Sequence, residues 1–214
     1  MFDELPSSNQ APCLLRIIAA TEAAVKLTPD MRASLATRAV TASEHVLAKG
    51  GSVCALLACA RMLARMRPPA SAPIKPQAAL QRALRAADAA PGAQAPALFC
   101  DCLEAALDLS MPPAFCGELA VLCAEYVAWA ARMGVGAARA AGAAQATRFA
   151  GLRERVVAVT GKPVSEPAGA SAGAGAAGAS AAAGAAGEAA EAAPPTGQPT
   201  FAASSGAPTT EEDL

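Results

Sequence analysis

Cysteine is the residue type here that could most readily hold a metal ion or act as a nucleophile, since seven cysteines occur among the 214 residues. Zinc sites usually take cysteines in closely spaced pairs such as CxxC. Cys100 and Cys102 instead form a CxC pair, and no CxxC pair exists. Cys116 and Cys123 are seven residues apart, which places them on one helical face, as expected of buried thiols. The sequence therefore predicts no metal site.

Acid–base or nucleophilic catalysis would have to use His45, the only histidine, or a pair of carboxylates. His45 falls late in a predicted helix, where the terminal carbonyl groups favour a cation. Glu118 and Glu125 share a helical face, but nothing around them indicates a polar cleft. The glycine-rich run from Gly134 follows a helix, whereas a dinucleotide-binding loop follows a strand. We therefore predict a protein that is not an enzyme, with no catalytic residue and no cofactor.

Arginine side chains are a further feature that could bind a ligand, because several of them fall on two predicted helices. Aromatic residues, which would stack on bases, make up only 3% of the chain, and no nucleic-acid-binding motif occurs. Binding of an anion or a nucleic acid through this face is therefore the second alternative, and nucleic acid is not the expected partner. The candidate basic patch consists of Arg61, Arg65, Arg67, Arg82 and Arg85.

Tyr126 and Trp129, the single tyrosine and the single tryptophan, are the candidate anchors for a protein partner. Both residue types are common at the centres of protein interfaces. They lie on an apolar path with helical spacing that runs from Phe115 to Met133. A lone Trp in a small bundle also serves as a core residue, and the sequence leaves both interpretations open.

Charge divides the chain into two parts. Residues 1–162 hold all 17 basic and 12 acidic residues, for a net charge of +5, whereas residues 163–214 hold six acidic residues and no basic one. Arginines outnumber lysines 13 to 4, which together with the abundant Ala, Gly and Pro is typical of a GC-rich genome, such as that of a bacterium or a large DNA virus.

Neither a secretory signal nor a transmembrane segment is expected. The start, MFDELPSSNQ, is acidic and polar, whereas a signal peptide needs a basic and then an apolar segment. The longest apolar stretch, residues 114–134, carries Glu118 and Glu125, whose burial in a bilayer is costly. With an odd number of cysteines, these features predict an intracellular protein of a reducing compartment, cytoplasmic or nuclear.

Helical periodicity recurs along the first three quarters of the chain. Thr28 is the expected N-cap of a second helix, with Pro29 in its first turn, and Ser52 is the expected N-cap of the third. Gly50 is expected to end the second helix in a left-handed conformation. The helix of residues 114–133 is expected to lie at the centre of the fold. Helices are predicted over residues 12–27, 28–47, 52–67, 77–89, 97–110, 114–133 and from 137 to about 160.

No strand pattern and no repeat of fixed period occur, so the predicted fold is all-α: a single antiparallel bundle of about six or seven helices over residues 11–162. Residues 1–10 are expected to be flexible. Residues 163–214 are expected to be a disordered, acidic, low-complexity tail, because closely spaced glycines disfavour helix and no large apolar side chain appears before Phe201.

These features favour a structural or adaptor protein that acts through contacts with other proteins, including copies of itself. It would suit an assembly component of a GC-rich bacterium or of a large DNA virus. The first alternative is a regulator that captures an amphipathic helix in a groove beside residues 115–133. An encircled helix with an apolar groove would favour capture, whereas a broad apolar face would favour assembly.

Overall fold

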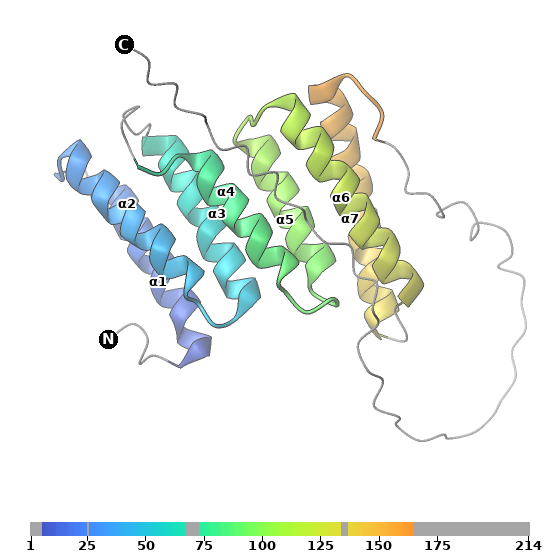
Figure 1. Ribbon diagram of the computed structural model, residues 1–214, viewed down its shortest axis with the longest axis horizontal. Helices are drawn as coiled ribbons and strands as arrows, with labels where there is room; N and C mark the ends of the chain where they lie inside the picture. Colours follow the sequence, from blue (N-terminus) through green and yellow to red (C-terminus); the bar gives the residue numbers. More distant parts are fainter. Residues whose placement is uncertain (1–5, 25, 67–72, 134–136, 165–214) are drawn as a thin grey trace, which may run out of the picture.

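The predicted all-α fold is confirmed, because the described residues form seven helices and no strand (Figure 1). The computed structural model describes residues 6–24, 26–66, 73–133 and 137–164, with the backbone alone for Met133 and residues 137–141. The expectations for residues 1–5, for Gly134 and for the tail from residue 165 lie outside this part. The helices are α1 (Ser7–Ala23), α2 (Pro29–Glu44), α3 (Lys49–Met66), α4 (Pro76–Asp88), α5 (Ala95–Asp108), α6 (Pro113–Met133) and α7 (Ala137–Thr160).

Successive helices alternate in direction and stand in a row, with α1 and α2 at one end and α6 and α7 at the other (Figure 1). Extensive contacts join each helix only to helices one or two places away in the chain. α3 packs against α1, α2, α4 and α5, whereas α6 packs against α5 and α7. The antiparallel bundle is thus an open array rather than a closed ring, and α3, α4 and α5 are its central helices.

The expected central position of the helix at residues 114–133 is therefore wrong. That helix, α6, is long and apolar enough to have suggested a core position, and it is the one described helix that could span a membrane by length and composition. Only 39% of its most apolar window is buried, because it lies at the end of the array and has neighbours on one side only. A single helix of this kind gives no clear transmembrane segment.

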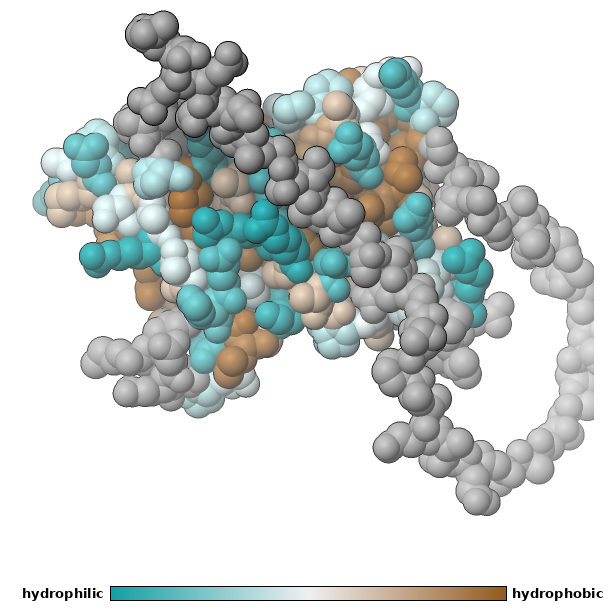
Figure 2. All heavy atoms as spheres, viewed as in Figure 1, coloured by the Kyte–Doolittle hydropathy of each residue, from teal (hydrophilic) through white to brown (hydrophobic). Residues whose placement is uncertain are grey.

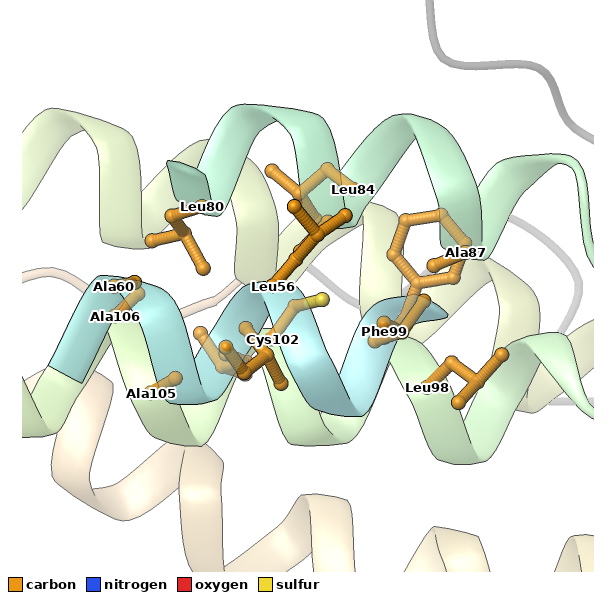
Figure 3. Close-up of a cluster of buried hydrophobic side chains, with 14 of the residues drawn as sticks. Leu56, Ala60, Leu80, Leu84, Ala87, Leu98, Phe99, Cys102, Ala105 and Ala106 are labelled. Carbon is orange, nitrogen blue, oxygen red and sulfur yellow. The ribbon is translucent and has the colours of Figure 1, made fainter. Parts of the chain in front are cut away.

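Alanine sets the spacing of the central helices. Leu56 of α3, Leu84 of α4 and Phe99 of α5 interdigitate in the core and are fully or almost fully buried (Figure 3). Ala60, Ala87 and the adjoining Ala105 and Ala106 lie among them and are completely buried. Small side chains at these positions let the helix backbones approach closely, so the core is dense although it contains few aromatic rings.

The predicted start of α2 is confirmed. Thr28 has an extended backbone, and its hydroxyl oxygen accepts a hydrogen bond from the N–H of Met31 at 3.3 Å. Pro29 occupies the first turn, where a backbone N–H has no acceptor within the helix, so the lack of an N–H in proline costs nothing. Asp30 adds negative charge at the positive end of the helix dipole.

The predicted starts of α1 and α3 are wrong, and near each start a side chain bonds to another part of the chain; α1 and α2 also end earlier than predicted, at Ala23 and Glu44. α1 begins at Ser7 instead of residue 12, and the buried Gln10 side chain accepts the N–H of Leu47 at 3.2 Å. α3 begins at Lys49, so Ser52 lies inside the helix and Gly50 is helical rather than left-handed. The Ser52 hydroxyl is not an N-cap but donates to the carbonyl of Ser43 at 2.8 Å, which satisfies a buried group near the end of α2.

Gly92, in the turn between α4 and α5, allows the ring of Trp129 to lie directly against the backbone. A Cβ atom at residue 92 would lie 2.5 Å from Cη2 and 3.2 Å from Cζ3 of Trp129. The rigid indole ring cannot move aside without disturbing the packing of α6 on the turn.

We predict that Gly92→Ala destabilises the protein by about 1–3 kcal/mol, the usual cost of overpacking. Urea denaturation followed by circular dichroism measures the change. Gly151→Ala is the matched control, since a Cβ there would have nothing within 4 Å and alanine is the better helix former, so this variant should be stabilised. Equal stability of the Gly92→Ala variant and the parent protein would contradict the packing of Trp129 described above.

Candidate functional site

Tyr126 is not an accessible anchor for a partner, which corrects the interpretation of this residue as a contact anchor. Its side chain is completely buried and stacks on Phe99 of α5, with ring centroids 4.2 Å apart and planes inclined by 19°. Its hydroxyl donates a hydrogen bond of 2.5 Å to Asp88 at the end of α4. Tyr126 therefore ties α6 to both α5 and α4. Trp129, one turn further on, is half-buried against Gly92.

Three of the five candidate arginines lie close to carboxylates of other helices. Arg65 of α3 pairs with Glu22 of α1 at 2.6 Å, and Arg82 of α4 pairs with Glu44 of α2 at 2.9 Å. Arg61 lies 3.9 Å from Asp108 of α5. Arg67 is outside the described residues, and Arg85 is exposed. Three of these side chains thus face carboxylates on three different helices, which lowers the positive field that an anion would meet.

The other candidates for catalysis lie apart from one another. His45 is the exposed C-cap of α2, in agreement with its expected place at a helix end. Glu118 and Glu125 are both exposed on α6. No group of three or more histidine, cysteine or acidic side chains able to hold a metal ion occurs in the described part of the chain.

Acidic side chains along α5 form a charged cluster with arginines of α7, and their spacing could have been recognised in the sequence. Arg148 of α7 bonds to Asp101 at 2.7 Å and to Glu104 at 2.5 Å. One heptad later, Arg155 bonds to Asp108 at 2.8 Å. Partial burial alone would lower the pKa of Arg148. Its hydrogen bonds to Glu104 and Asp101 outweigh that effect, so the pKa is raised. This ion-pair row fixes the register of α7 on α5.

Two thiols meet inside the protein at a place that the cysteine spacing did not indicate. Cys100 of α5 and Cys123 of α6 are both completely buried, and their Sγ atoms lie 3.4 Å apart. Cys116, which shares a helical face with Cys123, donates instead to the carbonyl of Met111 at 3.6 Å. Burial raises the pKa of Cys59 to about 11, although a hydrogen bond with Ser43 partly offsets it. Sequence spacing alone could not have paired cysteines 23 positions apart on different helices.

A mainly apolar groove lies between the start of α6 and the end of α7, with a volume of about 440 Å³. Val121 and Val156 form its walls, Glu118 and Lys162 supply charge, and Pro163 and Val164 close one side. It is the clearest concave surface beside α6.

Exposed large apolar side chains are unevenly distributed over the described residues. Eight large apolar side chains in this part of the chain are exposed, and none of them lies on α3, α4 or α5. On the face that Figure 2 shows, hydrophilic residues cover much of α4, whereas hydrophobic ones gather toward the α6 end. The eight are Leu15 and Ile17 on α1, Met31 and Leu35 on α2, Leu47 in the turn after α2, Val121 on α6, and Val157 and Val159 on α7.

No protein family model matches this chain, and comparisons with curated proteins and with solved structures likewise give no match.

We predict that Tyr126→Phe lowers the free energy of unfolding by about 1–2 kcal/mol, because the ring stack is kept and the hydrogen bond to Asp88 is lost. A double-mutant cycle with Asp88→Ala, measured by urea denaturation, isolates this contact. The two changes should be less costly together than the sum of the single changes. Strict additivity would show that the hydroxyl and the carboxylate do not interact.

We also predict that Arg148→Gln destabilises the protein by about 0.5–1 kcal/mol at low ionic strength and by less in about 1 M salt, because the ion pairs are partly exposed and are screened. Thermal unfolding at both salt concentrations measures the difference. Arg85→Gln, which removes an exposed arginine in no ion pair with another described residue, is the control and should have little effect. A loss that is independent of salt would contradict the electrostatic role of Arg148.

Proposed function

We propose that this protein is a non-enzymatic structural or adaptor component that assembles with other protein chains through the apolar ends of its helical array. The observation that carries the proposal is the position of the exposed apolar side chains, all of which lie outside the three central helices. Helical arrays whose helices contact only near neighbours expose an uncovered helix face at each end, and stable monomers cover that face with polar residues. Here the end helices keep apolar residues instead.

The α1–α2 end is the better supported of the two surfaces. Met31 and Leu35 are one helical turn apart on α2, and Met31 is 53% exposed. Ile17 of α1 is 45% exposed. Burying such side chains against a partner stabilises a complex by about 25 cal/mol for each Å² of apolar surface removed from water, before the costs of association.

Capture of a partner helix beside α6 is the second candidate function, and the groove of about 440 Å³ between α6 and α7 is what favours it. α6 is not encircled by other helices, and the groove reaches only from the start of α6 to the end of α7. It offers space for a few apolar side chains rather than for a helix of several turns. Binding through an arginine-rich face has less support, because the carboxylates of Glu22 and Glu44 pair with Arg65 and Arg82.

We predict that the double change Met31→Glu and Leu35→Glu abolishes assembly without unfolding the protein, because both side chains point into solvent in the single chain. Purified full-length protein is examined by sedimentation velocity over a range of concentrations, and tagged protein is used to recover partners from native cells. Partner recovery should fall about tenfold or more, equivalent to the loss of at least 1.4 kcal/mol of binding free energy.

The matched control is Gln77→Glu with Gln81→Glu, which adds the same charge at the same spacing on an exposed face of the central helix α4. This control should assemble normally. A parent protein that stays monomeric and recovers no specific partner would overturn the proposed function. Loss of assembly in both double variants would show that added charge, and not the α1–α2 face, is responsible.

A further inference from the structure

The contact between Cys100 and Cys123 lies in the middle of the seam between α5 and α6 and has no part in the proposed function. The two Sγ atoms are 3.4 Å apart, and neither residue has any exposed surface. The other buried cysteines have different neighbours: the Cys59 thiol lies beside the Ser43 hydroxyl, and the Cys116 thiol donates to a backbone carbonyl. Among the described residues no other pair of thiols lies at hydrogen-bonding distance.

We propose that Cys100 and Cys123 form a redox-active dithiol that closes to a disulfide and thereby cross-links α5 to α6. The sulfur atoms must approach by about 1.4 Å to reach the S–S bond length of ~2.05 Å. Rotation about the Cα–Cβ bonds supplies much of that movement, because both sulfurs are at the ends of short side chains. The seven cysteines of the reduced chain include this one pair that is positioned for closure.

The surroundings distinguish the two sulfurs and identify Cys100 as the one that reacts first. The hydrogen bond between the two thiols lowers the pKa of Cys100 and outweighs the opposing effect of burial. The charge of Arg148 also lowers this pKa, whereas the charges of Asp101 and Glu104 raise it. The same hydrogen bond, together with burial, raises the pKa of Cys123. The thiolate is the reactive form of cysteine, so oxidation begins at Cys100.

Hydrogen peroxide, a small oxidant, completes the chemistry in two steps. The Cys100 thiolate attacks one peroxide oxygen, the O–O bond breaks, and hydroxide leaves, which gives a sulfenic acid at Cys100. The Cys123 sulfur then attacks the Cys100 sulfur, the S–O bond breaks, and the S–S bond forms as the hydroxyl group and the Cys123 proton leave as water. In total two thiols lose two electrons and two protons, and one peroxide becomes two waters.

Burial selects the kind of oxidant that reaches this pair. Hydrogen peroxide is close to water in size and needs only a brief local opening between α5 and α6. A bulky disulfide oxidant needs a much larger opening. Cys54, which is exposed on α3, and Cys13, which is half-buried on α1, react with either kind of oxidant.

The experiment exposes the reduced full-length protein to hydrogen peroxide, blocks the remaining thiols by alkylation under denaturing conditions, and maps disulfides by mass spectrometry of proteolytic peptides. The expected result is a peptide pair joined through Cys100 and Cys123, together with a rise of several degrees in melting temperature that a dithiol reductant reverses. Cys102→Ala on α5 and Cys116→Ala on α6 remove buried thiols of the same helices and should leave the cross-link intact.

Two results would overturn the proposal. One is recovery of Cys100 and Cys123 as free thiols while Cys54 is oxidised, and the other is a disulfide that joins a different pair. Cys123→Ser, whose hydroxyl can still donate to Cys100 but cannot close a disulfide, should leave Cys100 as a sulfenic acid that a dimedone-type reagent labels, and absence of that label in a folded variant would also count against the proposal. Should the variant not fold, the peptide map of the parent protein decides alone. Assembly through α1 and α2 is unaffected by any of these results.

Discussion

Close packing of α3, α4 and α5 through alanine is the constraint on which the rest of the fold depends. Completely buried alanines such as Ala60, Ala87 and Ala105 leave no room for bulkier side chains between these helices, so the large residues Leu56, Leu84 and Phe99 must fill the gaps that remain. A core of this kind gains stability from close contact of many small groups rather than from a few aromatic rings. It also orders the helices in a row, because a helix packed this closely on three or four neighbours has little surface left for others.

The row explains why the exposed apolar side chains of the described residues lie outside α3, α4 and α5. The central helices have neighbours on both sides, whereas α1 and α7 have neighbours on one side only. A helix at the end must either carry polar residues on its outer face or be covered by another chain. Ile17 and Met31 at one end and Val157 at the other are exposed apolar residues on such helices, which supports the proposed assembly. The same geometry separates these surfaces from the polar cross-links of the interior, so changes at one need not disturb the other.

Local chemistry could be predicted from the sequence, and long-range pairing could not. Thr28 and Pro29 define the start of α2 because an N-cap needs only residues within one turn, and the seven helices follow from periodicity alone. Serine is a common N-cap residue, yet the Ser52 hydroxyl donates to the carbonyl of Ser43 across a turn. Tyrosine is common at protein interfaces, yet Tyr126 is buried, stacks on Phe99 and donates a hydrogen bond to Asp88. In both cases the partner comes from another helix, and its place depends on how the helices pack, which spacing within one helix does not determine.

The seam between α5 and its two C-terminal neighbours combines three chemically different contacts. The stack of Tyr126 on Phe99 is apolar and insensitive to salt, the ion pairs of Arg148 with Asp101 and Glu104 weaken as salt screens them, and the thiols of Cys100 and Cys123 respond to oxidation. All of them attach the α6–α7 pair to the array through α5, because α6 has no other extensive neighbour than α5 and α7 among the described helices. A covalent bond at the thiols would hold α6 on α5 even when the other contacts loosen, so the redox state of one buried pair governs how firmly this end of the array is attached.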